Sequence, residues 1–136
     1  MILGVDPGTK RVGVAAADEE TRFALPVEVI DAGTHDPVTR LLELVEERSV
    51  SLIVVGRPTG LSGRAGPAAA VASEFAERLR AATSVPVEEY DERLTTVIAE
   101  RSLRGSRAKT EARGSVRDAV AAQVMLQDFL DARGPV

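Results

Sequence analysis

Two hydrophobic segments separated by a tight turn open the chain. Residues 2–5 are β-forming, Pro7-Gly8-Thr9 has the composition of a turn, and residues 12–16 alternate with a period of two. This pattern predicts a β-hairpin over residues 1–18. Asp6 stands at the end of the first predicted strand, where an unpaired carboxylate is costly to desolvate. Its partner is therefore expected to be a metal ion, a phosphate-bound metal, or a nearby Lys or Arg.

The pattern further along the chain predicts strands that alternate with helices. Three more strands are expected at residues 22–30, 52–55 and 85–90. Helices are expected from Pro37 to about residue 48, from Pro67 onward, at about residues 95–104 and at about residues 115–131. The connections at residues 56–66 and 105–114 are rich in glycine and polar residues.

Particular residues mark the ends and faces of these elements. Asp36 fits the N-cap of the first helix, with Pro37 at the first helical position. Pro26 indicates that the third strand lies at an edge or contains a bulge. The uninterrupted apolar residues 52–55 indicate a strand buried on both faces. The expected apolar positions of the second and last helices are Val71, Phe75 and Leu79, and Val116, Ala119, Val120, Val124, Leu126 and Leu130.

The order of elements predicts a single α/β domain over residues 1–136 with a mixed sheet. The first three strands are joined by short connections and should pair antiparallel, whereas helical crossovers make the first, fourth and fifth strands parallel. The carboxyl ends of the parallel strands are Asp6, Gly56 and Asp91-Glu92. Ligands favour that edge in open α/β sheets.

Acidic residues from distant parts of the sequence are expected to meet at this edge. They are Asp6, Asp91, Glu92 and, near the start of the last helix, Asp118. A cluster of carboxylates repels itself unless cations hold it together, and oxygen ligands without His or Cys suit Mg²⁺ or Mn²⁺. Two such ions about 4 Å apart can activate water and stabilise the leaving oxygen in phosphodiester hydrolysis.

Composition and charge restrict the choice of partner. The chain has no Cys, which suits a reducing cytoplasm, and neither a signal peptide nor an apolar run long enough to span a membrane is expected. The net charge is −4, yet residues 93–117 contain two acidic and seven basic side chains. Such a segment can bind a polyanion on an acidic protein, or it is a solvated surface. Its basic residues are Arg93, Arg101, Arg104, Arg107, Lys109, Arg113 and Arg117.

Four motifs in order resemble the YqgF/RuvX family of Holliday-junction-resolvase-like nucleases, which are implicated in maturing the precursor of small-subunit ribosomal RNA. The resemblance covers nearly the whole chain. Its motifs are Leu3-Gly-Val-Asp6-Pro-Gly-Thr-Lys-Arg-Val-Gly-Val14, Leu52-Ile-Val-Val-Gly-Arg-Pro58, Tyr90-Asp-Glu-Arg-Leu-Thr-Thr-Val97 and Asp118-Ala-Val-Ala-Ala122.

The resemblance implies an RNase H-like fold with strand order 3-2-1-4-5 flanked by helices. It implies an acidic site of Asp6, Asp91, Glu92 and Asp118, with Mg²⁺ or Mn²⁺ held by Asp6, Glu92 and Asp118. Because Gly56 has no side chain, we expect it to leave room for a carboxylate of the fifth strand beside Asp6. The residues expected to contact nucleic acid are Lys10, Arg11, Arg93, Arg104, Arg107, Lys109, Arg113 and Arg117.

Two segments depart from the family pattern, and both concern contacts with substrate. The family usually has an apolar-Pro-apolar stretch after the fourth strand and then an Asp-Gly turn, where this chain has Arg57-Pro58-Thr59-Gly60 and Ser62-Gly63. The loop before the last helix is often Lys-rich in relatives, but here it contains Glu111 and several small residues.

Each candidate residue also has a structural interpretation. Asp6 could bond only its own turn, and the spacing of Ser115 and Asp118 fits a capping box. Lys10 and Arg11 could contact phosphate or screen Asp6. Arg93 could clamp a phosphate or pair with Glu89 or Asp91. His35 is the only His and is expected in a loop, so water activation would depend on metal and carboxylate.

Three functions compete at this stage. The first is a metal-dependent endonuclease of structured nucleic acid, with precursor 16S rRNA preferred over a branched DNA junction as substrate. The second is a non-catalytic factor that binds RNA or the small ribosomal subunit. The third is a nucleotide-dependent phosphotransferase, because Asp6-Pro-Gly-Thr9 resembles the phosphate loop of the actin and sugar-kinase ATPases. Those proteins use two such domains to enclose ATP, so a single domain of 136 residues is not expected to do so. The sequence leaves open whether the protein is a monomer or a homodimer, which matters because a junction resolvase cuts two strands.

Overall fold

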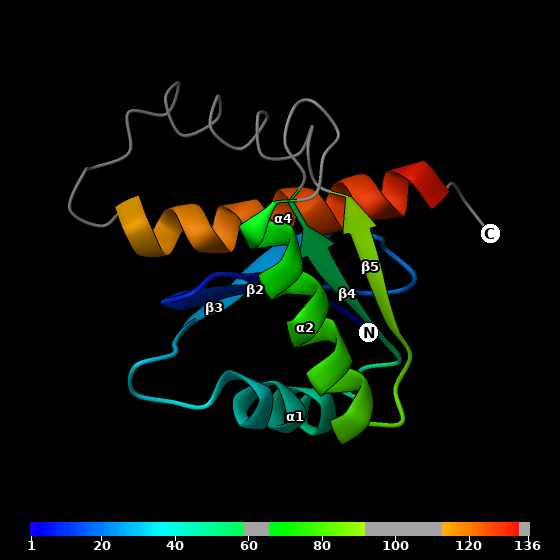
Figure 1. The fold of residues 1–136 in the computed structure, drawn as a ribbon. Helices are drawn as coiled ribbons and strands as arrows, with labels where there is room; N and C mark the ends of the chain where they lie inside the picture. Colours follow the sequence, from blue (N-terminus) through cyan, green and yellow to red (C-terminus); the bar gives the residue numbers. More distant parts are fainter. Residues whose placement is uncertain (59–65, 92–112, 134–136) are drawn as a thin grey trace.

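The computed structural model contains a five-stranded mixed sheet in the order β3-β2-β1-β4-β5 (Figure 1). It describes residues 1–58, 66–91 and 113–133. Strand pairs β1–β2 and β2–β3 are antiparallel, and β1–β4 and β4–β5 are parallel, as the sequence predicts. The elements are β1 (Ile2–Pro7), β2 (Arg11–Ala17), β3 (Ala24–Asp31), α1 (Pro37–Glu47), β4 (Leu52–Arg57), α2 (Pro67–Ala82), β5 (Val87–Asp91) and α4 (Arg113–Arg133).

Helices cover both faces of the sheet, so that the molecule has three layers. The helices α1 and α2 pack on one face, where Leu3 and Val5 of β1 meet Leu41, Phe75 and Leu79. The helix α4 crosses the other face, and its core contains Ile2, Val54, Met125, Leu126 and Leu130. Alternate residues of each central strand are therefore buried against different helices.

The interior strand β4 has side chains buried on both faces. Ile53, Val54 and Val55 are fully buried, which confirms the strand predicted from its uninterrupted apolar sequence. The N-cap prediction for α1 is also confirmed, since Oδ2 of Asp36 accepts hydrogen bonds from the Thr39 amide at 3.1 Å and from its hydroxyl at 2.7 Å.

The edge strand β3 begins at Ala24, two residues later than the predicted start at residue 22. Arg22 has a φ of 59°, so the chain is still turning there, and Gln127 of α4 binds the carbonyl of Arg22 and the amide of Ala24. Pro26 marks both an edge and a bulge as expected, because the β2–β3 register shifts next to it.

The predicted apolar face of α2 is wrong at one position. Phe75 and Leu79 are buried, but Val71 is 36% exposed, and the first turns are buried through Ala69 and Ala72 instead. Small side chains let this helix lie close to the sheet, which hydrophobicity alone does not reveal.

The last helix begins at Arg113 and is longer at both ends than predicted. Leu126 and Leu130 are buried as expected, but Val120 and Val124 are only half-buried, and Ala122, Met125 and Phe129 complete the buried face. Within the described residues, no helix is long and apolar enough to span a membrane. The short helix expected at about residues 95–104 lies outside the described residues.

Candidate active site

Asp6 is half-buried near the carboxyl end of β1, on the face of the sheet covered by α4. The face follows from alternation, because Ile2 packs against α4 and a Cβ added at Gly4 would lie 2.8 Å from Cβ of Leu126. Val5 points to the opposite face, where it joins the core beneath α1 and α2. Burial of Val5 therefore fixes the direction in which the neighbouring carboxylate points.

Gly13 brings the backbone of Asp118 against the strand pair that carries Asp6. It is the cross-strand partner of Asp6 on β2, and an added Cβ would lie 2.1 Å from the carbonyl oxygen of Asp118. The backbone of α4 thus rests directly on β2 at this position. An isolated glycine in a strand is the sequence signal for such a close approach. At Gly13 this signal was present in the sequence, although Gly13 was not among the predicted site residues.

Asp118 is not a helix-capping residue. The helix begins five residues earlier, at Arg113, and its first turn contains no acidic residue. The alternative based on a capping box with Ser115 is therefore wrong, because Ser115 already lies within α4. The Asp118 side chain is 28% exposed, so it is accessible to solvent at the carboxyl edge of the sheet.

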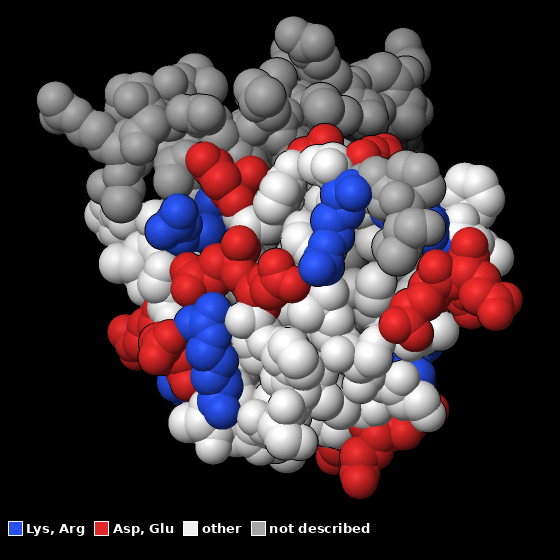
Figure 2. Space-filling view, turned by 90° about the vertical axis from the view of Figure 1, so that its right-hand side faces the viewer, with Lys and Arg blue, Asp and Glu red and all other residues white. Residues whose placement is uncertain are grey.

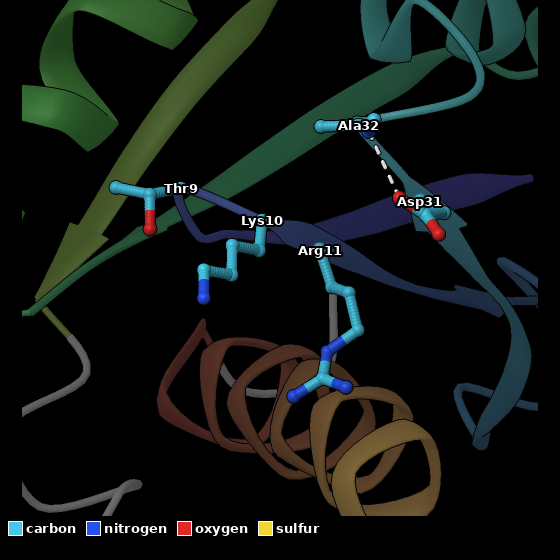
Figure 3. A pocket seen from close by; sticks show the side chains of 6 residues that line it. Thr9, Lys10, Arg11, Asp31 and Ala32 are labelled. Carbon is cyan, nitrogen blue, oxygen red and sulfur yellow. Dashed lines mark hydrogen bonds between the residues drawn. The ribbon is translucent and has the colours of Figure 1, made fainter.

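Arg11 binds Asp118 across the two elements. Its Nε lies 2.9 Å from Oδ2 of Asp118, and Figure 3 shows its side chain extending from the start of β2 toward α4. Arg11 shares the face of Gly13, two positions along the strand, so it stands on the same side of the sheet as Asp6. The sequence suggested that Arg11 contacts phosphate or screens Asp6. The structure adds a third role, in which Arg11 neutralises Asp118.

A shallow pocket adjoins this ion pair. Thr9, Lys10 and Arg11 line one side, and Asp31 and Ala32 line the other (Figure 3). Oδ1 of Asp31 accepts a 2.8 Å hydrogen bond from the Gly33 amide, which holds the loop after β3. The pocket consequently presents two cations beside a carboxylate that is occupied by its own loop.

Asp91 ends β5 at the same edge of the sheet, but alternation places it on the other face. Glu89, two residues earlier, binds Ser73 and Arg80 of α2, while Glu88 and Tyr90 contact α4. Asp91 therefore shares the α2 face, and the structure does not bring it together with Asp6 and Asp118. Glu92 lies outside the described residues, so its role and the space beside Gly56 stay predictions.

Tyr90 is a residue of this region whose contacts were not predicted. It is the parallel partner of Gly56, and its hydroxyl donates a 2.6 Å hydrogen bond to Oδ2 of Asp128. That hydrogen bond, with burial, raises the pKa of Tyr90 to about 12. The ring also packs edge-on against Phe129, with centroids 5.6 Å apart. These partners are 38 and 39 residues away, and no local pattern identifies them.

The remaining predicted cations are only partly described. Arg93, Arg104, Arg107 and Lys109 lie outside the described residues, and Arg113 and Arg117 belong to the part of α4 where only the backbone is described. Figure 2 shows the side of the molecule next to β5, where acidic and basic side chains are interspersed. The described part of that face has no extended basic surface. Of the described cations predicted to contact nucleic acid, Arg11 forms an ion pair with Asp118, and Lys10 lines the same pocket as Arg11.

The described donors suit a hard divalent cation. They are carboxylate oxygens from Asp6 and Asp118, and Mg²⁺ is commonly held by one or two carboxylates together with water and phosphate oxygens. Among residues 1–58, 66–91 and 113–133, no group of three or more His, Cys, Asp or Glu side chains is placed so that it could hold a metal ion. The Arg11 cation at Asp118 shows independently that this position attracts positive charge.

The model of a protein family described as RuvX, Holliday junction resolvase, matches residues 1–132. A relative from Chloroflexus aurantiacus is 45% identical over 136 residues, covering 98% of this chain and 88% of that protein. A relative from Corynebacterium glutamicum is 41% identical over 142 residues, covering 96% and 78%. Both carry the name "Putative pre-16S rRNA nuclease".

Solved resolvase structures share the fold. RuvC of T. thermophilus in complex with a Holliday junction substrate aligns with a TM-score of 0.54 and 19% identity, over 97% of this chain and 94% of that one. The fowlpox virus Holliday junction resolvase aligns with a TM-score of 0.54 and 11% identity, over 96% and 98%. At these identities the likeness concerns the fold, which matches the RNase H-like sheet order expected from the sequence.

Proposed function

The chain belongs to the RuvX family of Holliday junction resolvases, and from that premise we propose that it cleaves structured nucleic acid with a divalent metal ion. It is a nuclease, because the description of its family and the names of its relatives both specify cleavage of nucleic acid. The observation that supports a metal-dependent site is the close approach of the Asp118 backbone to Gly13, the cross-strand partner of Asp6. Residues 112 positions apart supply two carboxylates to one edge of one sheet face.

Asp6 and Asp118 would hold Mg²⁺ or Mn²⁺. Glu92 is proposed as a third ligand because it follows the end of β5 within the motif Tyr90–Val97. A bound ion of this kind lowers the pKa of water and stabilises the leaving oxygen of a phosphodiester. Arg11 pairs with Asp118 and lines the adjoining pocket with Lys10, so both cations can bind phosphate oxygens there, Arg11 with two parallel donors. Asp91 lies on the opposite face of the sheet from Asp6 and Asp118. We therefore propose that it orients the end of β5 or contacts groups other than the metal, and that it is not a metal ligand.

Precursor 16S rRNA is the proposed substrate, and the reaction is proposed to take place in the cytoplasm. Relatives 38–45% identical over nearly the whole chain carry that rRNA in their names, whereas the junction-bound structures share only the fold. Branched DNA is the second candidate, since the family description names the Holliday junction. Symmetric cutting of a junction would require a homodimer, whereas cutting one RNA strand requires a single site.

The experiment compares wild type with Asp6→Asn on a labelled rRNA precursor and a labelled four-way DNA junction, in Mg²⁺ or Mn²⁺. Loss of a metal-holding carboxylate should slow cleavage about a hundredfold or more, because metal stabilisation of charge is worth several kcal/mol. Asp18→Asn is the matched control, since Asp18 is exposed beyond the far end of β2 and its own loop amides bind it.

The possible results separate the candidates. Cleavage of the RNA alone supports rRNA processing, and cleavage of the junction alone supports the resolvase. Equal cleavage by wild type and Asp6→Asn would exclude Asp6 as a ligand. Binding of the rRNA precursor with no cleavage in either metal would instead favour a non-catalytic factor.

A further inference from the structure

Arg11 and a metal ion would compete for the same carboxylate. Nε of Arg11 lies 2.9 Å from Oδ2 of Asp118, which is the contact distance of a charge-assisted hydrogen bond. Asp118 is also one of the two described carboxylates that suit a divalent cation. A guanidinium and a divalent cation bound to one carboxylate repel each other, so occupancy by the metal favours displacement of Arg11.

The ion pair is suited to such an exchange. The side chains of Arg11 and Asp118 are 49% and 28% exposed, and exposed pairs contribute little to stability. Both groups can regain water when the pair separates. The core beneath is held by other contacts, because Gly13 keeps α4 on β2 through backbone atoms. Breaking the pair therefore leaves the site's framework in place.

The displaced guanidinium of Arg11 could bind a phosphate of the substrate. Arg11 lines the pocket with Thr9 and Lys10, and its side chain extends from there toward α4, where it pairs with Asp118 (Figure 3). A phosphate brought to metal held by Asp118 would enter beside these cations. The fork of an arginine matches two phosphate oxygens, which a lysine cannot reproduce.

We propose that Arg11 is a placeholder cation, which neutralises Asp118 when no metal is bound and moves to the substrate phosphate once metal takes that carboxylate. This inference rests on the proposed metal-dependent function. It assigns opposite effects to one side chain, since Arg11 weakens the binding of metal and strengthens the binding of nucleic acid. A purely structural ion pair would have neither effect.

The test measures Mn²⁺ binding by calorimetry on the full chain, without nucleic acid. Arg11→Gln should bind Mn²⁺ about two- to fivefold more tightly than wild type, the range expected for removing an exposed ion-pair competitor. Arg11→Lys should stay near wild type, because a cation remains. Lys10→Gln removes the same charge one position away and should change the affinity less than Arg11→Gln does.

Cleavage kinetics should show the opposite effect, namely weaker binding of nucleic acid when Arg11 is replaced. Arg11→Gln should raise KM for the labelled nucleic acid about tenfold or more, since a charge-assisted contact to phosphate is lost. Arg11→Lys should raise KM as well, although it leaves Mn²⁺ affinity unchanged. Thermal unfolding of each variant checks that the fold is retained.

The outcomes distinguish this inference from the proposed function. Wild type that binds no Mn²⁺ overturns both. Wild type that binds Mn²⁺, with Arg11→Gln binding equally or more weakly, overturns the placeholder role alone. Equal tightening in Lys10→Gln also overturns it, because the effect would then reflect general charge rather than the pair with Asp118.

Discussion

The Tyr90 hydroxyl donates a 2.6 Å hydrogen bond to Oδ2 of Asp128, which ties the end of β5 to the helix that carries Asp118. Arg133 reinforces the same junction, since it lies 5.0 Å above the Phe129 ring and 3.4 Å from Oε2 of Glu88. The strand from which the chain continues to Glu92 is thereby attached to α4. The geometry of the acidic site depends on contacts outside it.

Tyr90→Phe should reduce the free energy of unfolding by about 1–2 kcal/mol. The substitution keeps the edge-on ring contact with Phe129 but leaves the Asp128 carboxylate without this donor. Urea unfolding followed by circular dichroism measures the change. Phe129→Leu is the complementary variant, because it removes the ring contact and leaves the hydrogen bond. An unchanged unfolding midpoint in Tyr90→Phe would show that the bond contributes nothing.

Asp128→Asn should lower the pKa of Tyr90 from about 12 toward its ordinary value of 10.0, because the carboxylate that favours the protonated phenol is replaced. Since the pKa is raised in the folded protein, the stabilisation is complete below pH 10 and is lost as the pH rises toward 12. The chain has one Tyr and no Trp, so ultraviolet absorbance reports this phenol alone. Identical titrations of variant and wild type would contradict the assignment.

Local patterns account for much of the fold. The alternation in β2, the uninterrupted apolar sequence of β4 and the Asp36-Pro37 start of α1 depend on neighbouring residues, and each was predictable. Errors arose where packing between distant elements decides. Val71 is more hydrophobic than Ala72, but the closeness of α2 to the sheet buries the alanine.

The candidate site also combines features that the sequence predicts with features that depend on packing between distant elements. Asp6 and Asp118 could be predicted as acids at one edge of the sheet, because the order of elements places the end of the first strand near the start of the last helix. The ion pair of Arg11 with Asp118 could not, since it joins positions 107 residues apart and depends on how α4 crosses β2. Alternation along residues 87–91 groups Asp91 with Glu89, but it does not reveal which helix covers that side of the strand. The contacts of Glu89 with α2 and of Tyr90 with α4 supply that information, and they join positions distant in the sequence.

Glu28→Gln should make the stability of the protein less sensitive to acid. Arg40 binds both carboxylate oxygens of Glu28, at 2.9 and 2.8 Å, and this hydrogen bonding holds the pKa of Glu28 below its ordinary value of 4.5. A lowered pKa stabilises the fold above pH 4.5, and this contribution is lost as the pH falls through the folded value. The two proteins should therefore differ near neutrality and converge in acid, as measured by urea unfolding across this range.

Glu46→Gln is the control for that comparison, because it removes the same charge from exposed α1 surface without touching the pair of Glu28 and Arg40. A difference between wild type and Glu28→Gln that persists undiminished below pH 4.5 would attribute the effect to packing rather than to the ionised carboxylate.

Gly13→Ala should damage both the fold and the metal site. Its Cβ would lie 2.1 and 2.6 Å from the carbonyl oxygen and carbon of Asp118, and backbone atoms cannot rotate away as a side chain can. We expect α4 to move off β2, at a cost of about 2–3 kcal/mol. Because the displaced residue is Asp118 itself, Mn²⁺ affinity should fall even at temperatures where the variant remains folded.

Gly4→Ala separates these two effects, because it disturbs the same helix at a distance from the acids. Its Cβ would lie 2.8 Å from Cβ of Leu126, so stability should fall, but Asp118 should stay beside Asp6 and Mn²⁺ affinity should be retained. Gly66→Ala adds a neutral reference, since nothing lies within 4 Å of its added Cβ. If Gly13→Ala and Gly4→Ala lost Mn²⁺ affinity equally, the close approach at Gly13 would matter only for stability. Selective loss in Gly13→Ala would instead tie Mn²⁺ binding to the contact that places Asp118 next to Asp6.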